Sequence, residues 1–408
     1  MTETKQAARL PLSGIKIVDF SRLLPGPWAT TMLADMGAEV IKVEQPGIGD
    51  PSRYNPPVYR DESVYFHTVN AGKRGIALDL SKPEGVEVAH RLLRWADVAI
   101  ESFRPSVAAR LKVDFESAKA LNAGIIYCSI SGFGQTGPLA AVPGHDLVIQ
   151  AMSGILKPHQ DGSAKPGMPS FQAGDLAAAN MATIAILAAL RRRDQTGEGA
   201  NLDIALLDSL VAMSNISLLP GLSRHAGGPG TPALEAWGAT PRYTLDPTAD
   251  GGYLAVCLLE ARLWGEFCRA IGRDDLISED ERHEDRHSSH GGRAERYREA
   301  IQAFCMSRPR DEIAREMAGL GIPVMPVLGP DEVMAHENTR VRNLAHRQPH
   351  PSQGQITVLT NPLVSAGLAR SEPRSPAPRL GEHGSDVLEM LGYEDDAICD
   401  LNAKGIVS

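Results

Sequence analysis

Two polar segments of this chain carry residue types that transfer protons or attack carbonyl groups in enzymes. Asp175 lies where an irregular stretch, residues 170–174, gives way to a long apolar helix expected over residues 176–193. Gly144-His145-Asp146 lies thirty positions before it. A carboxylate at the start of a buried helix meets free backbone N–H groups and the positive end of the helix dipole. Taken alone, Asp175 is most simply interpreted as a helix N-cap, whereas the rest of the chain favours a functional role.

The elements that must hold these residues are those of an α/β sheet. Apolar segments typical of buried strands alternate with helices through the first 135 residues, and a further strand follows residue 195. This alternation predicts an open parallel sheet that binds ligands at the carboxyl ends of its strands. The expected strands cover residues 14–20, 38–44, 74–80, 96–102 and 123–130.

The length of 408 residues predicts two domains. We expect a large domain over residues 1–217 and a Gly- and Pro-rich linker or mobile loop over 218–240. A strand and amphipathic helices over residues 241–330 predict a smaller α/β domain. The Pro-rich segment 331–408 is expected to return to the large domain.

Composition excludes several classes of protein. A hydrophobic content of 43% with 22% charged residues is typical of a soluble globular protein, and the apolar runs are too short for membrane spans. The net charge of −9 gives no electrostatic reason to bind nucleic acid or an anionic membrane. Five cysteines without paired spacing, together with an N-terminus that lacks a signal peptide, predict a cytoplasmic protein.

Two patterns that look like motifs indicate neither a dinucleotide-binding site nor a metal site. Residues 132–137 spell G-x-G-x-x-G, but Pro138 follows where a binding helix would have to begin. His283, His287 and His290 have the spacing of metal ligands within a segment too polar to hold a helix against a core. We therefore expect no metal site and no tightly bound cofactor.

Basic residues cluster at Lys73-Arg74, just before an expected strand, and between Arg104 and Arg110, just beyond another. Two interpretations stay open here. The charges belong to solvated turns, or they form an anion site at the ligand edge of the sheet, where arginine binds phosphate bidentately.

Taken together, motifs that run in order across almost the whole chain resemble those of the class III CoA-transferase family. This family includes carnitine and formate/oxalate transferases and also the α-methylacyl-CoA racemases. The matching segments are residues 26–27, 37–44, 70–74, 78–80, 102–105, 129–138, 144–146, 174–175 and 379–383.

The resemblance implies a Rossmann-like large domain, a smaller α/β domain and two subunits interlocked like links of a chain, here expected as a homodimer. The substrate would be an acyl-CoA thioester, with a carboxylic acid as the second substrate. Leu23, Leu24 and Pro25 resemble the loop that lies along CoA. The residues that resemble its nucleotide contacts are Leu78, Ser102, Phe103 and Arg110.

By the same resemblance, Asp175 matches the catalytic aspartate of two chemistries. In a transferase the carboxylate attacks the acyl-CoA to give a mixed anhydride and then an aspartyl thioester. Backbone N–H groups at the helix start would stabilise the oxyanion. In a racemase, Asp175 and His145 would face opposite sides of the α-carbon and exchange its proton. A third hypothesis is a CoA-binding partner subunit without activity.

Some residues around these positions resemble those of the racemases, and others resemble those of the transferases. His145, with Glu260 as its possible orienting partner, resembles the racemases. The run Leu-Ala-Ala-Ala-Asn after Asp175 and the segment 147–154 resemble the transferases. Leu24 stands where the oxalate enzymes carry a functional glutamine, which argues against formate or oxalate. We favour CoA transfer and keep racemisation as the alternative.

Overall fold

The computed structural model describes residues 10–156, 166–228, 240–282, 285–286 and 289–408. The chain forms two compact units, each described here by itself. The first comprises residues 1–153, 169–213 and 337–408, and the second comprises residues 154–168 and 214–336.

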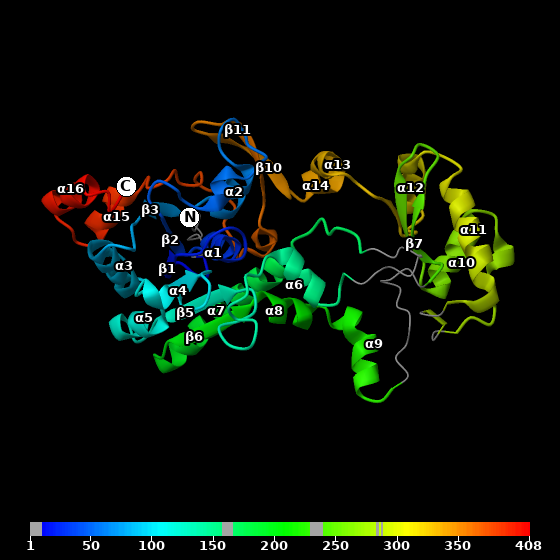
Figure 1. Cartoon of the computed structure of the whole chain (residues 1–408). Coiled ribbons are helices and arrows are strands. Elements are labelled where there is room, and N and C mark those ends of the chain that lie inside the picture. Colours follow the sequence, from blue (N-terminus) through cyan, green and yellow to red (C-terminus); the bar gives the residue numbers. More distant parts are fainter. Residues whose placement is uncertain (1–9, 157–165, 229–239, 283–284, 287–288) are drawn as a thin grey trace, which may run out of the picture. The chain divides into compact units, whose positions relative to one another are not determined.

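Parallel strands form the central six-stranded sheet of the first unit, in the order β3-β2-β1-β4-β5-β6 (Figure 1). This result confirms the Rossmann-like parallel sheet expected from the sequence. The strand order reverses between β1 and β4, and sheets of this type bind ligands beyond the carboxyl ends of the two strands at that point. The strands are β1 (Lys16–Asp19), β2 (Glu39–Glu44), β3 (Arg74–Ala77), β4 (Val98–Glu101), β5 (Ile126–Ser131) and β6 (Ala200–Ala205).

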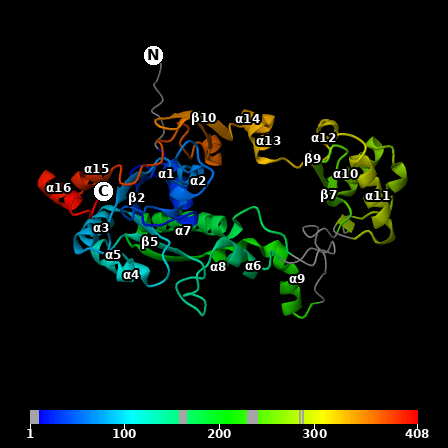
Figure 2. The same cartoon turned by 45° about the horizontal axis from the view of Figure 1, so that its top comes forward.

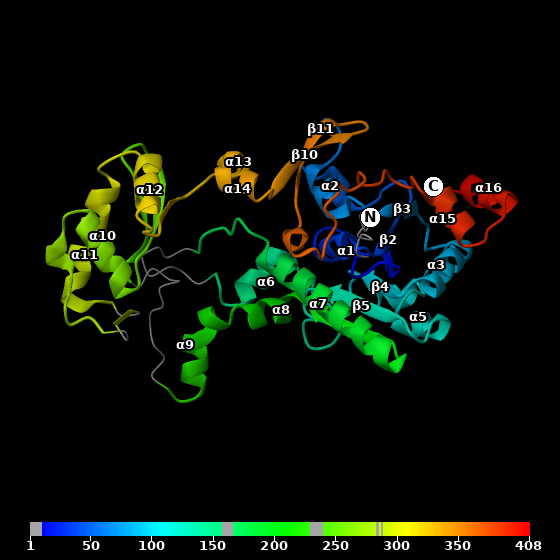
Figure 3. The same ribbon diagram turned by 180° about the vertical axis from the view of Figure 1, so that it is seen from behind.

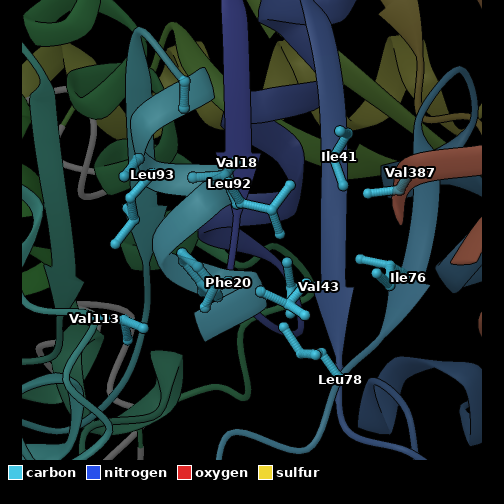
Figure 4. Packing of buried hydrophobic residues seen from close by; sticks show 14 of the residues in the cluster. Val18, Phe20, Ile41, Val43, Ile76, Leu78, Leu92, Leu93, Val113 and Val387 are labelled. Carbon is cyan, nitrogen blue, oxygen red and sulfur yellow. The ribbon is translucent and has the colours of Figure 1, made fainter. Parts of the chain in front are cut away.

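Helices that cover one face of this sheet enclose an apolar core. Strand residues such as Val18 and Ile41 pack there with Leu92 of α3 and Val387 of α15 (Figure 4). Pro83 opens α3 at a position where its missing N–H leaves no hydrogen bond unmade. The helices of this face are α3 (Pro83–Trp95), α5 (Phe115–Leu121), α15 (Gly384–Met390) and α16 (Asp395–Ala403).

The helix that carries Asp175 is α7 (Ala173–Thr196), which begins three residues earlier than expected and ends before Gly197 in the left-handed conformation. It packs against α1 (Pro25–Asp35), α8 (Leu206–Met213) and strands β5 and β6. Its length and mean hydropathy of 1.6 are those of a membrane span, but half of its most apolar stretch is buried within the fold. Elsewhere in the described residues, α8 and α9 (Asn215–His225) reach the length and hydropathy of a membrane span only when they are taken together, and the chain bends by 84° between them.

Shorter elements complete the first unit (Figure 2). A 3₁₀-helix at Pro51–Tyr54 follows β2, and a hairpin of β10 (Ala345–His350) and β11 (Gly354–Leu359) precedes α15. The remaining helices of this unit include α2 (Val64–Asn70), α4 (Val107–Arg110), α6 (Asp146–Met152) and α14 (Glu337–Val341).

The second unit is an antiparallel sheet in the order β7-β8-β9, packed against helices (Figure 3). Its core contains Trp264, Phe267 and Tyr297, with Trp264 and Tyr297 ring centroids 4.5 Å apart. Besides α9, the elements of this unit include β7 (Tyr243–Pro247), β8 (Tyr253–Cys257), β9 (Val324–Pro326), α10 (Ala261–Ala270), α11 (Ala294–Cys305), α12 (Arg310–Gly319) and α13 (Pro330–Ala335).

The first part of the segment 218–240, which was expected to be a linker or mobile loop, is helical. Helix α9 continues to His225, because Ile216, Leu219 and Leu222 maintain a helical repeat through the Gly- and Pro-rich sequence. Residues 229–239 of the same segment, and His283 and His287, lie outside the described residues.

Candidate active site

Asp175 is the third residue of α7 and not its N-cap, a position that Gln172 occupies without a side-chain hydrogen bond. The simplest interpretation of Asp175, a capping residue, is therefore wrong. Its side chain is partly buried. No donor among the described residues forms a hydrogen bond with its carboxylate. The carboxylate is thus held at the helix start, and no donor in the described part of the chain occupies its oxygens.

Asp146, the first residue of α6, performs the capping that the sequence suggested for Asp175. One carboxylate oxygen, Oδ1, accepts hydrogen bonds from the N–H groups of Gly174 at 2.7 Å and Asp175 at 3.2 Å. The other, Oδ2, accepts from Nε2 of Gln150 at 2.6 Å. The same Nε2 donates to the Phe171 carbonyl at 2.7 Å. The Gly-His-Asp segment is therefore fixed to the residues that present Asp175.

These bonds correct one expectation about the chemistry. Backbone N–H groups at the helix start were expected to stabilise an oxyanion, but those of Gly174 and Asp175 are bound to Asp146. The N–H groups of Ala173 and Leu176 donate to the carbonyls of Phe171 and Gln172. A donor already bonded at this geometry has no hydrogen left for a developing oxyanion, so stabilisation must come from other groups.

The environment of Asp175 disfavours its charged form. Burial raises the pKa of Asp175 to about 7, and the negative charge of Asp146 adds to the effect. Near neutral pH the residue therefore exists in both protonation states. Groups that take part in catalysis commonly have such displaced pKa values.

Tyr65, in α2, is a residue of this neighbourhood that the sequence did not single out. Burial raises the pKa of its phenol, and the negative charges of Asp175 and Asp50 raise it further. The phenol is therefore a neutral hydrogen-bond donor within electrostatic range of Asp175. It lies 110 positions from Asp175 in an unremarkable segment, and no local pattern links the two.

Glycines without a Cβ allow the segments of this site to pack closely against one another. A Cβ on Gly174 would lie 2.8 Å from Cγ2 of Ile149 and 3.1 Å from Oδ1 of Asp146. A Cβ on Gly144 would lie 2.9 Å from the Cα atom of Gly132. Glycine at these positions therefore permits Asp146 to reach the start of α7.

Substitution of Gly144 by alanine is expected to lower the free energy of unfolding by about 1–3 kcal/mol, since its methyl group would clash with backbone. The displacement of Asp146 should also lower transfer activity. Urea denaturation measures the first effect. Gly221→Ala is the control, because a Cβ there meets nothing within 4 Å and alanine is the better helix former. Equal stability of the two variants would contradict this description of the packing.

The two other residues expected in catalysis lie in different units. His145 is the exposed N-cap residue of α6 and directly precedes Asp146. Glu260 lies in the second unit at the N-cap of α10, where its carboxylate contacts Arg286 at 3.0 Å. The proton-transfer role of His145 and the orienting role of Glu260 stay predictions.

The residues expected along CoA meet at the point where the strand order reverses. Leu23, Leu24 and Pro25 follow β1, and Ser102 and Phe103 follow β4. Ser102 Oγ accepts a hydrogen bond of 2.9 Å from the N–H of Arg22. The Arg22 guanidinium lies 5.5 Å from the centroid of the Phe103 ring. The structure thus joins the two loops at the edge where a nucleotide binds in sheets of this kind.

Two further expected CoA contacts have different surroundings. The Leu78 side chain is only 2% exposed and belongs to the sheet core (Figure 4). Any CoA contact at Leu78 would therefore involve its backbone. Arg110 is exposed at the end of α4, within reach of solvent anions. Contact of either residue with CoA remains a prediction.

Comparison with known proteins defines the class. The model of CoA-transferase family III matches residues 12–384. The succinate–glutarate CoA-transferase of Agrobacterium fabrum is 33% identical over 394 residues, covering 93% of this chain and 96% of the relative. Human succinyl-CoA:glutarate CoA-transferase is also 33% identical, covering 97% and 90%. The chain belongs to CoA-transferase family III.

The structural comparison agrees with this assignment. A solved CaiB/BaiF family protein from Brucella suis superposes with a TM-score of 0.77 at 30% identity, covering 94% of this chain and all of that one. The family and the names of these relatives support a CoA-transferase that acts on CoA thioesters.

Proposed function

We propose that this chain transfers CoA from an acyl-CoA thioester to a carboxylic acid through covalent intermediates on Asp175. The observation that carries the proposal is the Asp175 carboxylate, held at the start of α7, partly buried and not hydrogen-bonded to any described donor. A carboxylate that has already lost part of its hydration attacks a carbonyl more readily than one in bulk water.

The proposed reaction exchanges acyl bonds without a net oxidant or base. An Asp175 oxygen attacks the thioester carbonyl, which expels the CoA thiolate and forms a mixed anhydride. The thiolate then attacks the Asp175 carbonyl of the anhydride, which releases the donor carboxylate and forms an aspartyl thioester. The acceptor carboxylate reverses these two steps, so that the acceptor leaves as its CoA thioester and Asp175 is regenerated.

Short dicarboxylic acids are the acceptors that we propose to test first. The relatives from Agrobacterium fabrum and human are named for succinate and glutarate. Leu24 stands where the oxalate enzymes carry a functional glutamine, so formate and oxalate are weaker candidates. Succinyl-CoA with glutarate is therefore the first substrate pair.

The test of the reaction type uses heavy water. We expect the purified protein to form glutaryl-CoA from succinyl-CoA only when glutarate is present, with both thioesters measured by mass spectrometry. A 2-methylacyl-CoA incubated without any acceptor should gain no α-deuterium. Deuterium incorporation that disappears in His145→Ala, without thioester exchange in the parent protein, would overturn the transferase proposal.

One observation favours racemisation of an acyl-CoA as the second candidate function. His145 directly precedes Asp146, whose carboxylate binds the N–H of Asp175 at 3.2 Å. An imidazole and a carboxylate are thus carried by joined segments, as a 1,1-proton transfer would require. The same heavy-water incubation distinguishes the two reactions.

We also propose that the chain works as an interlocked homodimer. The α9 side chains Ile216, Leu219 and Leu222 are 56%, 44% and 58% exposed within the single chain, and their spacing places them on one helical face. Apolar helix faces of this kind are typical of subunit contacts. Sedimentation velocity should give the mass of two chains, and a single-chain mass at micromolar concentration would contradict the proposal.

A further inference from the structure

The chain leaves β1 in a conformation that its sequence disfavours. Leu23 has a φ of +64°, in the left-handed region that residues with a Cβ rarely adopt. Leucine has no side-chain polar group that would compensate within the loop, unlike asparagine or aspartate. Contacts from elsewhere in the fold must therefore hold this backbone in place.

Two buried side chains, together with Ser102, supply those contacts. The N–H of Leu23 donates to both carboxylate oxygens of Asp50, at 3.1 and 3.2 Å. Two residues earlier, the carbonyl of Ser21 accepts a hydrogen bond of 3.0 Å from Nζ of Lys42. Between them, the N–H of Arg22 is bound by Ser102 Oγ. Three successive residues of the loop are thus fixed by side chains from three other segments.

Lys42 and Asp50 also bind one another. Nζ of Lys42 lies 2.9 Å from Oδ2 of Asp50, and both side chains are 0% exposed. Burial, the largest single influence, would raise the pKa of Asp50, but the charge of Lys42 and the hydrogen bonds from Ser52 and Lys42 together outweigh it and lower that pKa, so the carboxylate stays ionised. Buried ion pairs contribute little to stability compared with apolar residues of the same volume. Positioning of the loop is the function that these contacts support.

Asp50 is itself held rigidly. Its Oδ1 accepts from the N–H of Ser52 at 2.9 Å and from Ser52 Oγ at 2.7 Å. Its own N–H donates to Oε2 of Glu44 at 2.8 Å, and Arg53 Nε binds the same Glu44 oxygen at 2.8 Å. The carboxylate therefore presents a fixed acceptor, and the position of Leu23 follows from it.

We propose that Asp50, supported by Lys42, is the positioning residue that shapes the CoA-binding loop formed by Leu23, Leu24 and Pro25. This inference rests on the proposed function, in which that loop lies along CoA. The hydrogen bonds and the ion pair of its carboxylate go to the N–H of Leu23, to Ser52 and to Lys42, so we assign Asp50 a positioning role and not a catalytic one. It acts through the backbone of Leu23, so its loss should weaken CoA binding much more than it slows the chemical step.

The test measures CoA affinity and turnover separately. In Asp50→Asn, the Kd for free CoA, from isothermal titration calorimetry, should rise about tenfold, as expected for the loss of a charge-assisted hydrogen bond. The kcat at saturating acyl-CoA should fall by less than about threefold. Adding Leu23→Gly should recover part of the affinity, since glycine adopts positive φ without strain. A merely structural role of Asp50 predicts no such recovery.

Asp35→Asn is the matched control. Asp35 is also buried, and its carboxylate binds Arg374 at 2.7 and 2.8 Å, away from the loop. It should lose stability but keep the parent Kd for CoA. If the lone charge of Lys42 prevents Asp50→Asn from folding, Lys42→Met with Asp50→Ala removes that charge, and the same rise in Kd is expected.

The outcomes separate this inference from the proposed function. A folded Asp50 variant that binds CoA as tightly as the parent protein would overturn the inference, while transfer by the parent protein would leave the function intact. Failure of the parent protein to bind CoA or exchange thioesters would instead contradict the proposed function.

Discussion

Replacement of Asp175 by asparagine is expected to lower kcat for thioester exchange by at least about 10³-fold, because an amide cannot form the anhydride or the thioester. Binding of CoA should change little, since Asp175 is not among the expected CoA contacts. The measurement is glutaryl-CoA formation under saturating succinyl-CoA and glutarate. Activity equal to that of the parent protein would assign the chain to a non-catalytic CoA-binding role.

The same variant should be more stable than the parent protein at alkaline pH. The folded-state pKa of Asp175, about 7, lies above the ordinary carboxyl value of 3.8. A group with a raised folded pKa stabilises the protein below its unfolded pKa, and this contribution is lost as the pH rises through the folded value. Asparagine has no proton to lose, so the melting temperature of Asp175→Asn should exceed that of the parent at pH 8 and approach it at pH 5.

Substitution of Asp146 by asparagine is expected to change both rate and pH dependence. Transfer requires ionised Asp175, so kcat/KM of the parent protein should rise with pH through about 7. Removal of the Asp146 charge should move this rise about one pH unit lower, while burial keeps the pKa above its ordinary value. The rate on the alkaline plateau should fall about tenfold or more, because the start of α7 is held less firmly.

Asparagine at position 146 retains one oxygen that can accept from the Gly174 N–H, but its NH2 group replaces the oxygen that accepts from Gln150 Nε2, so the start of α7 loses part of its support together with the charge. Asp208→Asn, an exposed carboxylate of α8, is the control for a general change in net charge. It should leave the pH profile unchanged. An Asp146→Asn profile that coincides with the parent curve would show that Asp146 does not influence the titration of Asp175.

The sheet could be predicted from the sequence because each strand is a short apolar run between turn residues, and parallel strands buried on both faces must be such runs. The positions of Leu23, Ser102 and Phe103 at strand ends followed from that pattern. The burial of Leu78 could not be read in the same way. Leu78 directly follows β3, and a shift of one position along the chain there decides whether a side chain points into the core or lies at the ligand edge.

The part of the site that sequence reasoning missed consists of contacts between distant segments. Asp146 reaches the N–H of Asp175 across 29 positions, and Asp50 reaches the N–H of Leu23 across 27. Neither contact leaves a local pattern, because the side chain and its backbone partner belong to different elements. Burial of Asp175, which displaces its pKa, likewise depends on the packing of α7 and not on its own sequence.

Trapping of the covalent intermediate tests most directly whether Asp175 is the nucleophile. The parent protein is incubated with succinyl-CoA, quenched with hydroxylamine and digested, and the peptide that contains Asp175 is analysed by tandem mass spectrometry. An aspartyl thioester or anhydride predicts a hydroxamate at Asp175 that requires succinyl-CoA and is absent from Asp175→Asn. An unmodified Asp175 in protein that is turning over substrate, or a hydroxamate on another residue, would contradict the proposed mechanism.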